Sequence, residues 1–208
     1  MTHSADNEGF SSNDIASGWP KANVLGVRID LITLAELLTF IETVIVRRRR
    51  AILAYVNVHA LNLARDLPWF RAALNSSAVV FCDGFGVKWG ARILGYRIPQ
   101  RFTPPDWLPL LAERSAVQGY TLFLLGAEPG VAERAAQRLQ AQHKGLRVVG
   151  THHGHFDHTL HSGASRAIIE TINAARPDIL LIGFGMPLQE RWLHEHWDLL
   201  EVRVALPI

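Results

Sequence analysis

The sequence predicts an α/β protein built on a mostly parallel β-sheet with helices on both faces. Two observations lead to this fold class. Short apolar runs alternate along the chain with amphipathic segments at helical spacing, which is the order of a parallel sheet connected by helices. Several runs are apolar throughout, as expected of strands that are buried on both sides. The clearest are residues 51–56, 78–83 and 178–183.

Length and composition favour one globular domain. The chain has 208 residues, of which 49% are hydrophobic, and its formal charge of +2 requires no nucleic-acid partner. The single cysteine, Cys82, excludes an internal disulfide and indicates a reducing compartment. Residues 1–20 are polar and lack the apolar core of a signal peptide, and no apolar run is long enough to span a bilayer. We expect a disordered tail at 1–20 and a single domain at 21–208, in the cytoplasm.

The first half of the chain predicts three strands and the helices between them. Residues 24–29 alternate loosely and are typical of an edge strand, and Thr33 and Glu36 form a capping-box sequence before a helix. Four arginines at 47–50 close that helix, either as a solvated end or as a contact to anionic lipid. A helix at 59–73, interrupted at Pro68, follows the strand at 51–56.

The second half repeats the alternation of strand and helix. A helix at about 107–118 stops at Gly119, which is a good residue for a helix C-terminus. Strands are predicted at 121–125, 146–150, 178–183 and 202–206. Helices are predicted after Gly130, around 168–172 and around Trp192.

The strand at 78–83 ends in an acidic residue that is a candidate catalytic group. In open α/β sheets, ligands bind beyond the carboxyl ends of the strands. Asp83 occupies such an end, and the adjacent Gly84 and Gly86 let a substrate approach the backbone. The alternative is that Asp83 only caps the next helix. Two further strand-to-helix turns carry paired glycines, at helix starts that suit phosphates: Gly126 with Gly130, and Gly183 with Gly185.

Other common chemistries find less support in the sequence. The third glycine after Gly84 and Gly86 comes at Gly90, one residue too late for the dinucleotide fingerprint, so a nicotinamide dehydrogenase is disfavoured. There is no P-loop and no serine-hydrolase elbow. A loop rich in histidine is interpreted as polar surface in preference to a zinc site. It contains His152, His153, His155, Asp157, His158 and His161.

Taken together, these residues resemble the WecG/TagA/CpsF glycosyltransferases (glycosyltransferase family 26). The resemblance extends from about Leu25 to the end of the chain. Its marks are the segments 25–30, 125–127 and 183–190, Asn57 after a strand, Asp83 with Gly84, Arg101 with Asp106, and Gly150 with Gly154.

The resemblance implies an enzyme that moves a sugar from a UDP-sugar to a polyprenyl-diphosphate-linked acceptor in cell-surface polysaccharide synthesis. The sugar would be of the N-acetylmannosamine type, its uronic acid, or a hexose. It implies inversion at the sugar carbon, no metal and no other cofactor, and action at the inner face of the cell membrane as a peripheral protein. A homo-oligomer is a further expectation.

The resemblance also assigns roles to individual residues. Asp83 would be the general base for the acceptor hydroxyl. Arg101 would stabilise the departing diphosphate, and Gln189 would offer a donor and an acceptor to sugar hydroxyls. Further substrate contacts are implied for Asn57, Gly84, Asp106, Gly126, Gly185 and Glu190.

Three departures from the family pattern shape these expectations. Tyr55 stands where threonine is usual, and Pro105 where glycine is usual. The chain also stops at Ile208, before an arginine-bearing segment of the family. A catalytically impaired nucleotide-sugar-binding module is therefore the alternative function. We also expect an apolar surface left uncovered, formed by Trp192, Trp197, Leu199 and Leu200.

Overall fold

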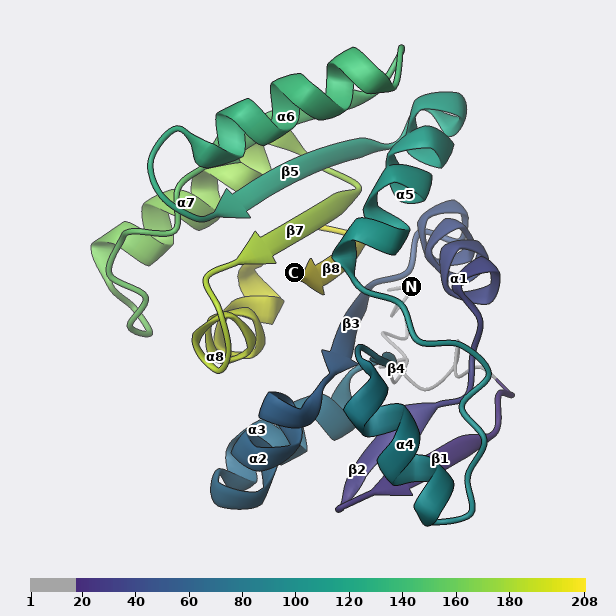
Figure 1. Ribbon diagram of the computed structural model, residues 1–208. Coiled ribbons are helices and arrows are strands. Elements are labelled where there is room, and N and C mark those ends of the chain that lie inside the picture. Colours follow the sequence, from purple (N-terminus) through teal and green to yellow (C-terminus); the bar gives the residue numbers. More distant parts are fainter. Residues whose placement is uncertain (1–17) are drawn as a thin grey trace, which may run out of the picture.

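The computed structural model describes residues 18–208 (Figure 1). A six-stranded sheet, parallel throughout, has the strand order β4-β3-β8-β7-β5-β6, and a separate antiparallel hairpin is formed by β1 and β2. The strands are β1 (Lys21–Val24), β2 (Val27–Asp30), β3 (Ala51–Val56), β4 (Val79–Cys82), β5 (Thr121–Gly126), β6 (Arg147–His152), β7 (Ile179–Gly183) and β8 (Val204–Pro207). The predicted fold class, a Rossmann-like α/β sheet, is confirmed.

Eight α-helices and a short 3-10 helix connect these strands within the described residues. The helices are α1 (Leu34–Val46), α2 (Val58–Asp66), α3 (Pro68–Ser76), α4 (Phe85–Ile93), α5 (Pro104–Gln118), α6 (Val131–Gln142), α7 (Gly163–Ala175) and α8 (Leu188–His196), and the 3-10 helix is η2 (Trp197–Leu199).

Both faces of the sheet are covered by other elements. Successive residues of a strand point to opposite faces, so each strand packs on both sides. In β5, Leu122 and Leu124 pack with α1, α5 and α6 on one face, whereas Phe123 and Leu125 pack with α7 and α8 on the other. On that second face, β3 and β4 are covered by α2, α3, α4 and the hairpin. Figure 1 shows the hairpin and α4 together at the end of the molecule remote from α6.

The parallel arrangement gathers the functional loops at one edge. All six strands of the large sheet run in the same direction, as Figure 1 illustrates for β5 and β7, so their carboxyl ends meet at a single edge. The loops after β3, β4, β5, β6 and β7 therefore lie along that edge, which is where open α/β sheets bind ligands.

The ends of several helices follow from local sequence, as predicted. Thr33 and Glu36 form the capping box of α1, with the Glu36 carboxylate accepting from the Thr33 backbone amide at 2.7 Å. Pro68 is the first residue of α3, where its missing N–H removes no helical hydrogen bond. Gly119 ends α5 in the left-handed conformation, at a φ of 77°.

Two sequence-based expectations are wrong. Residues 24–29 are not one edge strand: the chain reverses at Leu25 and Gly26, both at positive φ, to form the β1–β2 hairpin. The apolar C-terminal residues are largely covered. Trp192 and Leu200 are fully buried under α7, and only Leu199 remains mainly exposed.

The described residues cover only part of the predicted boundary between a tail at 1–20 and a domain at 21–208. Residues 1–17 lie outside the described part of the chain. Gly18, Trp19 and Pro20 are described, and the Trp19 ring meets the Phe40 ring at a centroid distance of 5.7 Å. The packed region therefore includes at least Trp19.

Candidate active site

Asp83 lies at the carboxyl end of β4, next to the end of β3. Its backbone N–H donates to the Val56 carbonyl at 2.9 Å, which fixes Asp83 beside Asn57. The Asn57 side chain uses its oxygen to cap α2, accepting from the Ala60 amide at 2.9 Å. Its NH₂ group is thus left to donate to the Asp83 carboxylate, with which it is hydrogen-bonded. One asparagine therefore both starts a helix and orients the acid.

The pKa of Asp83 is raised above that of an ordinary aspartate. Burial is the largest cause, because a half-buried carboxylate loses part of its hydration. The Asn57 hydrogen bond and the Arg101 charge act in the opposite direction, and the Asp106 charge adds to the rise. A carboxylate with a raised pKa holds an abstracted proton better than a solvated one does, which suits a general base.

Gly84 gives the Asp83 turn its shape. It adopts a φ of 110°, which side chains rarely tolerate, and a Cβ there would meet no atom within 4 Å. The turn therefore needs glycine for its backbone conformation, and the space beside it is open. Gly185, in the turn after β7, combines the same two properties at a φ of 86°.

Arg101 is held beside Asp83 from a different part of the chain. The Phe102 amide donates to the Cys82 carbonyl at 3.1 Å, which pins the loop before α5 against the end of β4. The Arg101 guanidinium lies 4.7 Å from the centre of the Phe85 ring and 3.1 Å from the Asp106 carboxylate. The cation is thus fixed in place while part of it remains exposed to solvent.

Asp106 has a structural task in this arrangement. One of its oxygens accepts from the Thr103 amide at 2.8 Å and from the Thr103 hydroxyl at 2.9 Å, closing the capping box of α5. These bonds lower the pKa of Asp106, which makes it a poor rival to Asp83 as a base. Its predicted contact with substrate stays a prediction.

Gln189 and Glu190 lie below the surface, at the start of α8. Gln189 is 0% exposed: its carbonyl oxygen accepts from the Gly185 amide at 3.0 Å, and its NH₂ donates to Glu190 at 3.0 Å and to the Tyr55 hydroxyl at 3.4 Å. Gln189 thus shapes the turn after β7 from beneath. Its direct contact with sugar hydroxyls stays a prediction, because both ends of its amide already have partners.

Glu190 is 3% exposed, and its second carboxylate oxygen has no hydrogen-bond partner within the described residues. Burial raises the pKa of Glu190 to about 7. It also raises the pKa of Tyr55 to about 12, with the charges of Glu190 and Asp83 adding to the effect. Tyr55 therefore lies within electrostatic reach of both carboxylates. The sequence marked Tyr55 only as a departure from the family pattern and gave no sign of this position.

The raised pKa of Glu190 predicts a pH-dependent stability. Its stabilising contribution is fully present below the unfolded value of 4.5 and is lost as the pH rises through about 7. The upper limit is about 3 kcal/mol, at 1.36 kcal/mol for each unit of pKa difference. Glu190→Gln imitates the protonated acid. We expect it to raise the melting temperature at pH 8.5 by several degrees, at about 2–4 °C for each kcal/mol, and to raise it by a clearly smaller amount at pH 5, which lies just above the unfolded value.

Thermal melts of both proteins at pH 5 and 8.5 test this expectation. Glu201→Gln is a matched control, because Glu201 is an exposed glutamate and should show no such pH difference. Equal gains at both pH values would contradict the assignment.

The turns after β5, β6 and β7 are packed directly against one another. The Ala127 amide donates to the Gly183 carbonyl at 2.9 Å, and the Gly154 amide donates to the Ala127 carbonyl at 2.8 Å. A Cβ on Gly126 would lie 2.4 Å from the Gly183 oxygen. Gly126 is therefore required for the approach of two strand ends, and its predicted contact with substrate stays a prediction.

Two hollows open beside these turns. The first, of about 540 Å³, is lined by Ala127, Gly154, His155, Phe156, His158, Gly183, Phe184 and Leu188. The second, of about 380 Å³, is mainly apolar and lies between α5, α6 and the ends of β5 and β7. Both lie at the carboxyl edge of the sheet, and either is large enough for part of a nucleotide.

The histidine-rich loop follows β6 and supplies aromatic surface to the first hollow. His158 packs against Phe184 at a centroid distance of 4.5 Å, and burial lowers its pKa. His155 lies 2.9 Å from the Glu128 carboxylate. Within residues 18–208, no group of three or more His, Cys, Asp or Glu side chains is arranged to hold a metal ion.

The sheet, its glycine turns and the carboxylate at its edge define an α/β enzyme of the Rossmann-like class. The model of the "Glycosyl transferase WecG/TagA/CpsF family" matches residues 22–208. The chain belongs to this family of glycosyltransferases, as the sequence motifs indicated.

Curated relatives agree with this assignment. Proteins named N-acetylglucosaminyldiphosphoundecaprenol N-acetyl-beta-D-mannosaminyltransferase, from Staphylococcus aureus strains MRSA252 and NCTC 8325, are each 24% identical to this chain over 194 residues. The matched region covers 92% of this chain and 74% of each relative. In residues 18–208, none of the helices combines the length and apolarity needed to cross a membrane.

Proposed function

We propose that this protein transfers an N-acetylmannosamine-type sugar from a UDP-sugar to a polyprenyl-diphosphate-linked saccharide. The names of the Staphylococcus aureus relatives specify that sugar and that class of acceptor for those proteins. The observation in this chain that supports the chemistry is Asp83, a carboxylate of raised pKa at the carboxyl edge of the sheet, oriented by Asn57 and flanked by Arg101. A uronic acid or a hexose as the transferred sugar is the alternative within the same reaction.

In the proposed reaction, an acceptor hydroxyl attacks the anomeric carbon of the donor sugar. The new carbon–oxygen bond forms as the bond from that carbon to the β-phosphate oxygen breaks, and UDP leaves with the electron pair. The hydroxyl proton passes to Asp83. UDP-sugars are commonly α-linked, so this single displacement yields a β-linked product. That outcome agrees with the β linkage in the relatives' names.

Arg101 is the group best placed to assist the leaving diphosphate. Its guanidinium is pre-oriented by Asp106 and the Phe85 ring, so little side-chain ordering remains to be done when the donor binds. Planar guanidinium donors match phosphate oxygens and stabilise the negative charge that grows on UDP. The hollows beside the turns after β5 and β7 offer aromatic and apolar surface to the nucleotide.

A transfer assay tests the proposal. The protein would be incubated with labelled UDP-N-acetylmannosamine, UDP-N-acetylglucosamine or UDP-glucose and a short-chain N-acetylglucosamine diphospholipid. We expect transfer from UDP-N-acetylmannosamine, with a β linkage identified by the one-bond carbon–proton coupling at the anomeric carbon of the product. Donor binding without any transfer would instead support the nucleotide-sugar-binding module.

Metal dependence gives a separate prediction. The chain contains no Asp-x-Asp sequence, which commonly holds the metal-bound donor diphosphate in sugar transferases, and Arg101 supplies a positive charge near the base. We expect the transfer rate to change by less than about twofold in EDTA, far below the effect of losing a catalytic Lewis acid. Abolition by EDTA and recovery with manganese would contradict this part of the proposal and direct attention to the histidine-rich loop.

A further inference from the structure

Helix α4 exposes an apolar stripe that the rest of residues 18–208 leaves largely uncovered, apart from Arg101, which lies over the Phe85 ring at its start. Phe85, Trp89 and Ile93 are 54%, 66% and 86% exposed, and they recur every fourth residue on one side of the helix. Val87 and Ala91, on the opposite side, are buried against the hairpin and α2. The helix thus has a packed face and a second apolar face turned to solvent, which marks an interaction surface.

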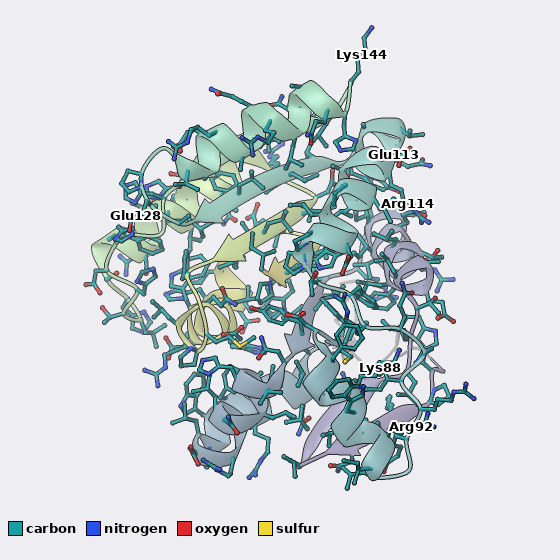
Figure 2. The ribbon with its side chains drawn as sticks, viewed as in Figure 1. Lys88, Arg92, Glu113, Arg114, Glu128 and Lys144 are labelled. Atoms are coloured by element: carbon teal, nitrogen blue, oxygen red, sulfur yellow. The ribbon has the colours of Figure 1, made fainter. Side chains whose placement is uncertain are left out.

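Cations accompany this stripe. Lys88 and Arg92 follow one flank of it in the helix sequence, in the part of the molecule remote from Lys144 (Figure 2). With Arg97 they line a hollow of about 550 Å³, together with Trp89, Tyr96, Ile98 and Pro99. The helix sequence contains no acidic residue. Within residues 18–208, none of these three cations forms a salt bridge.

We propose that α4 and the adjoining hollow form a membrane-docking surface that lies in the headgroup region of a bilayer containing anionic phospholipid. Apolar side chains on one side of a helix, with lysine and arginine at their flank, are the features of helices that lie in the plane of the interface. Tryptophan and tyrosine prefer the same depth. The cationic hollow is complementary to a phosphate headgroup.

A second copy of the chain is a less suitable occupant. In a two-fold symmetric contact, each patch meets itself, so Lys88 and Arg92 of the two copies would face like charges. An anionic surface neutralises these cations instead.

Helix α4 lies directly beside the candidate active site, so docking through α4 would also position that site at the membrane. This step rests on the proposed function. Asp83 lies two residues before α4, and Arg101 stacks on Phe85, the first residue of the helix. Docking of α4 would hold the base at the level of the headgroups. A polyprenyl-linked acceptor presents its diphosphate and its sugar at that level.

The arginines at 47–50 are poorly placed for this role. They precede β3 and so lie at the amino edge of the sheet, about 20 Å from Asn57 at the rise of a strand. Arg50 is further engaged by the Leu200 carbonyl at 2.7 Å and by the Trp197 ring at 4.2 Å. A bilayer that contacts these arginines would leave the carboxyl edge facing away.

Vesicle co-sedimentation tests the proposal without requiring turnover. Phosphatidylcholine vesicles with and without 30 mol% phosphatidylglycerol would be mixed with the wild-type protein and with the double variant Trp89→Ser/Ile93→Ser. We expect the wild type to bind the anionic vesicles preferentially and the double variant to bind them at least about tenfold more weakly. The matched control is Val117→Ser, a similarly exposed apolar residue on α5, which should leave binding unchanged.

The charged residues give a second comparison. Lys88→Gln/Arg92→Gln should weaken binding by about fivefold for each cation removed, whereas Arg47→Gln/Arg48→Gln should not change it. Unchanged binding in both α4 double variants would overturn the proposal. So would a concentration-dependent dimer in sedimentation velocity that the serine changes abolish, because it would assign the stripe to a second copy. Failure of the transferase assay with intact vesicle binding would count against the proposed function alone.

Discussion

Asp83→Asn is expected to lower the transfer rate by about 10²- to 10⁴-fold, the usual contribution of a general base. The change keeps the size of the side chain and an oxygen that can accept from Asn57, but it removes the group that takes the proton. The rate would be measured with saturating UDP-sugar and acceptor, so that weaker binding does not imitate a loss of chemistry.

Two controls separate this role from a structural one. The N-cap of α4 is Gly84, and the helix has no side-chain capping hydrogen bond, so the alternative that Asp83 caps α4 is wrong. Asparagine matches aspartate in size and keeps a hydrogen-bonding oxygen, so a purely structural Asp83 would tolerate the change with a near-normal rate. Donor affinity by calorimetry and the melting temperature should both remain close to wild type, because the Asp83 amide and the Val56 carbonyl stay paired. A rate within about threefold of wild type, small against the 10²-fold expected of a lost base, would show that Asp83 is not the general base.

Arg101→Gln is expected to have the second largest effect, a loss of about 10²- to 10³-fold in the transfer rate, as when a donor to a developing oxyanion is removed. Glutamine retains a polar side chain but carries no charge for the departing diphosphate. Arg101→Lys should recover only part of the rate, since a lysine keeps the charge but loses the planar fork and the stacking on Phe85.

Asp106→Asn is the companion to this variant. It removes the negative partner of Arg101 but keeps an oxygen for the Thr103 amide, so α5 should remain capped. We expect a much smaller loss, of about tenfold or less, because the charge on Arg101 is still present. If Asp106→Asn lowered the rate as far as Arg101→Gln, a direct role for Asp106 in substrate binding would replace the structural one.

The overall fold was predictable because its strands are buried on both sides. Short apolar runs such as Ile179–Gly183, alternating along the chain with helical segments, are typical of interior parallel strands, and glycine and proline mark where the runs end. The β1–β2 hairpin was missed because its turn is made by Leu25 and Gly26, and a leucine at positive φ is not a recognised turn signal. The burial of Trp192 and Leu200 depends on α7, which is distant in sequence.

The site was predictable only in part, for a similar reason. Asp83 and Asn57 were placed correctly because each directly follows a strand, and parallel strands bring such positions to one edge. The hydrogen bond from Gln189 to Tyr55 joins residues far apart in the chain. Sequence spacing gives no information on such contacts. It could not distinguish a side chain that faces the substrate from one that supports the turn beneath it.

The pH dependence of the transfer rate tests the central claim, that Asp83 accepts the proton, most directly. Asp83 must be ionised to act, so the rate should rise with pH through the pKa of Asp83, which burial places above the ordinary value of 3.8, and then level off. Glu190→Gln should retain this rise in rate at acidic pH, the acidic limb of the pH profile. The limb then cannot come from the titration of Glu190. The account predicts that the limb disappears in Asp83→Asn, leaving a low rate independent of pH. An unchanged limb in Asp83→Asn would contradict it.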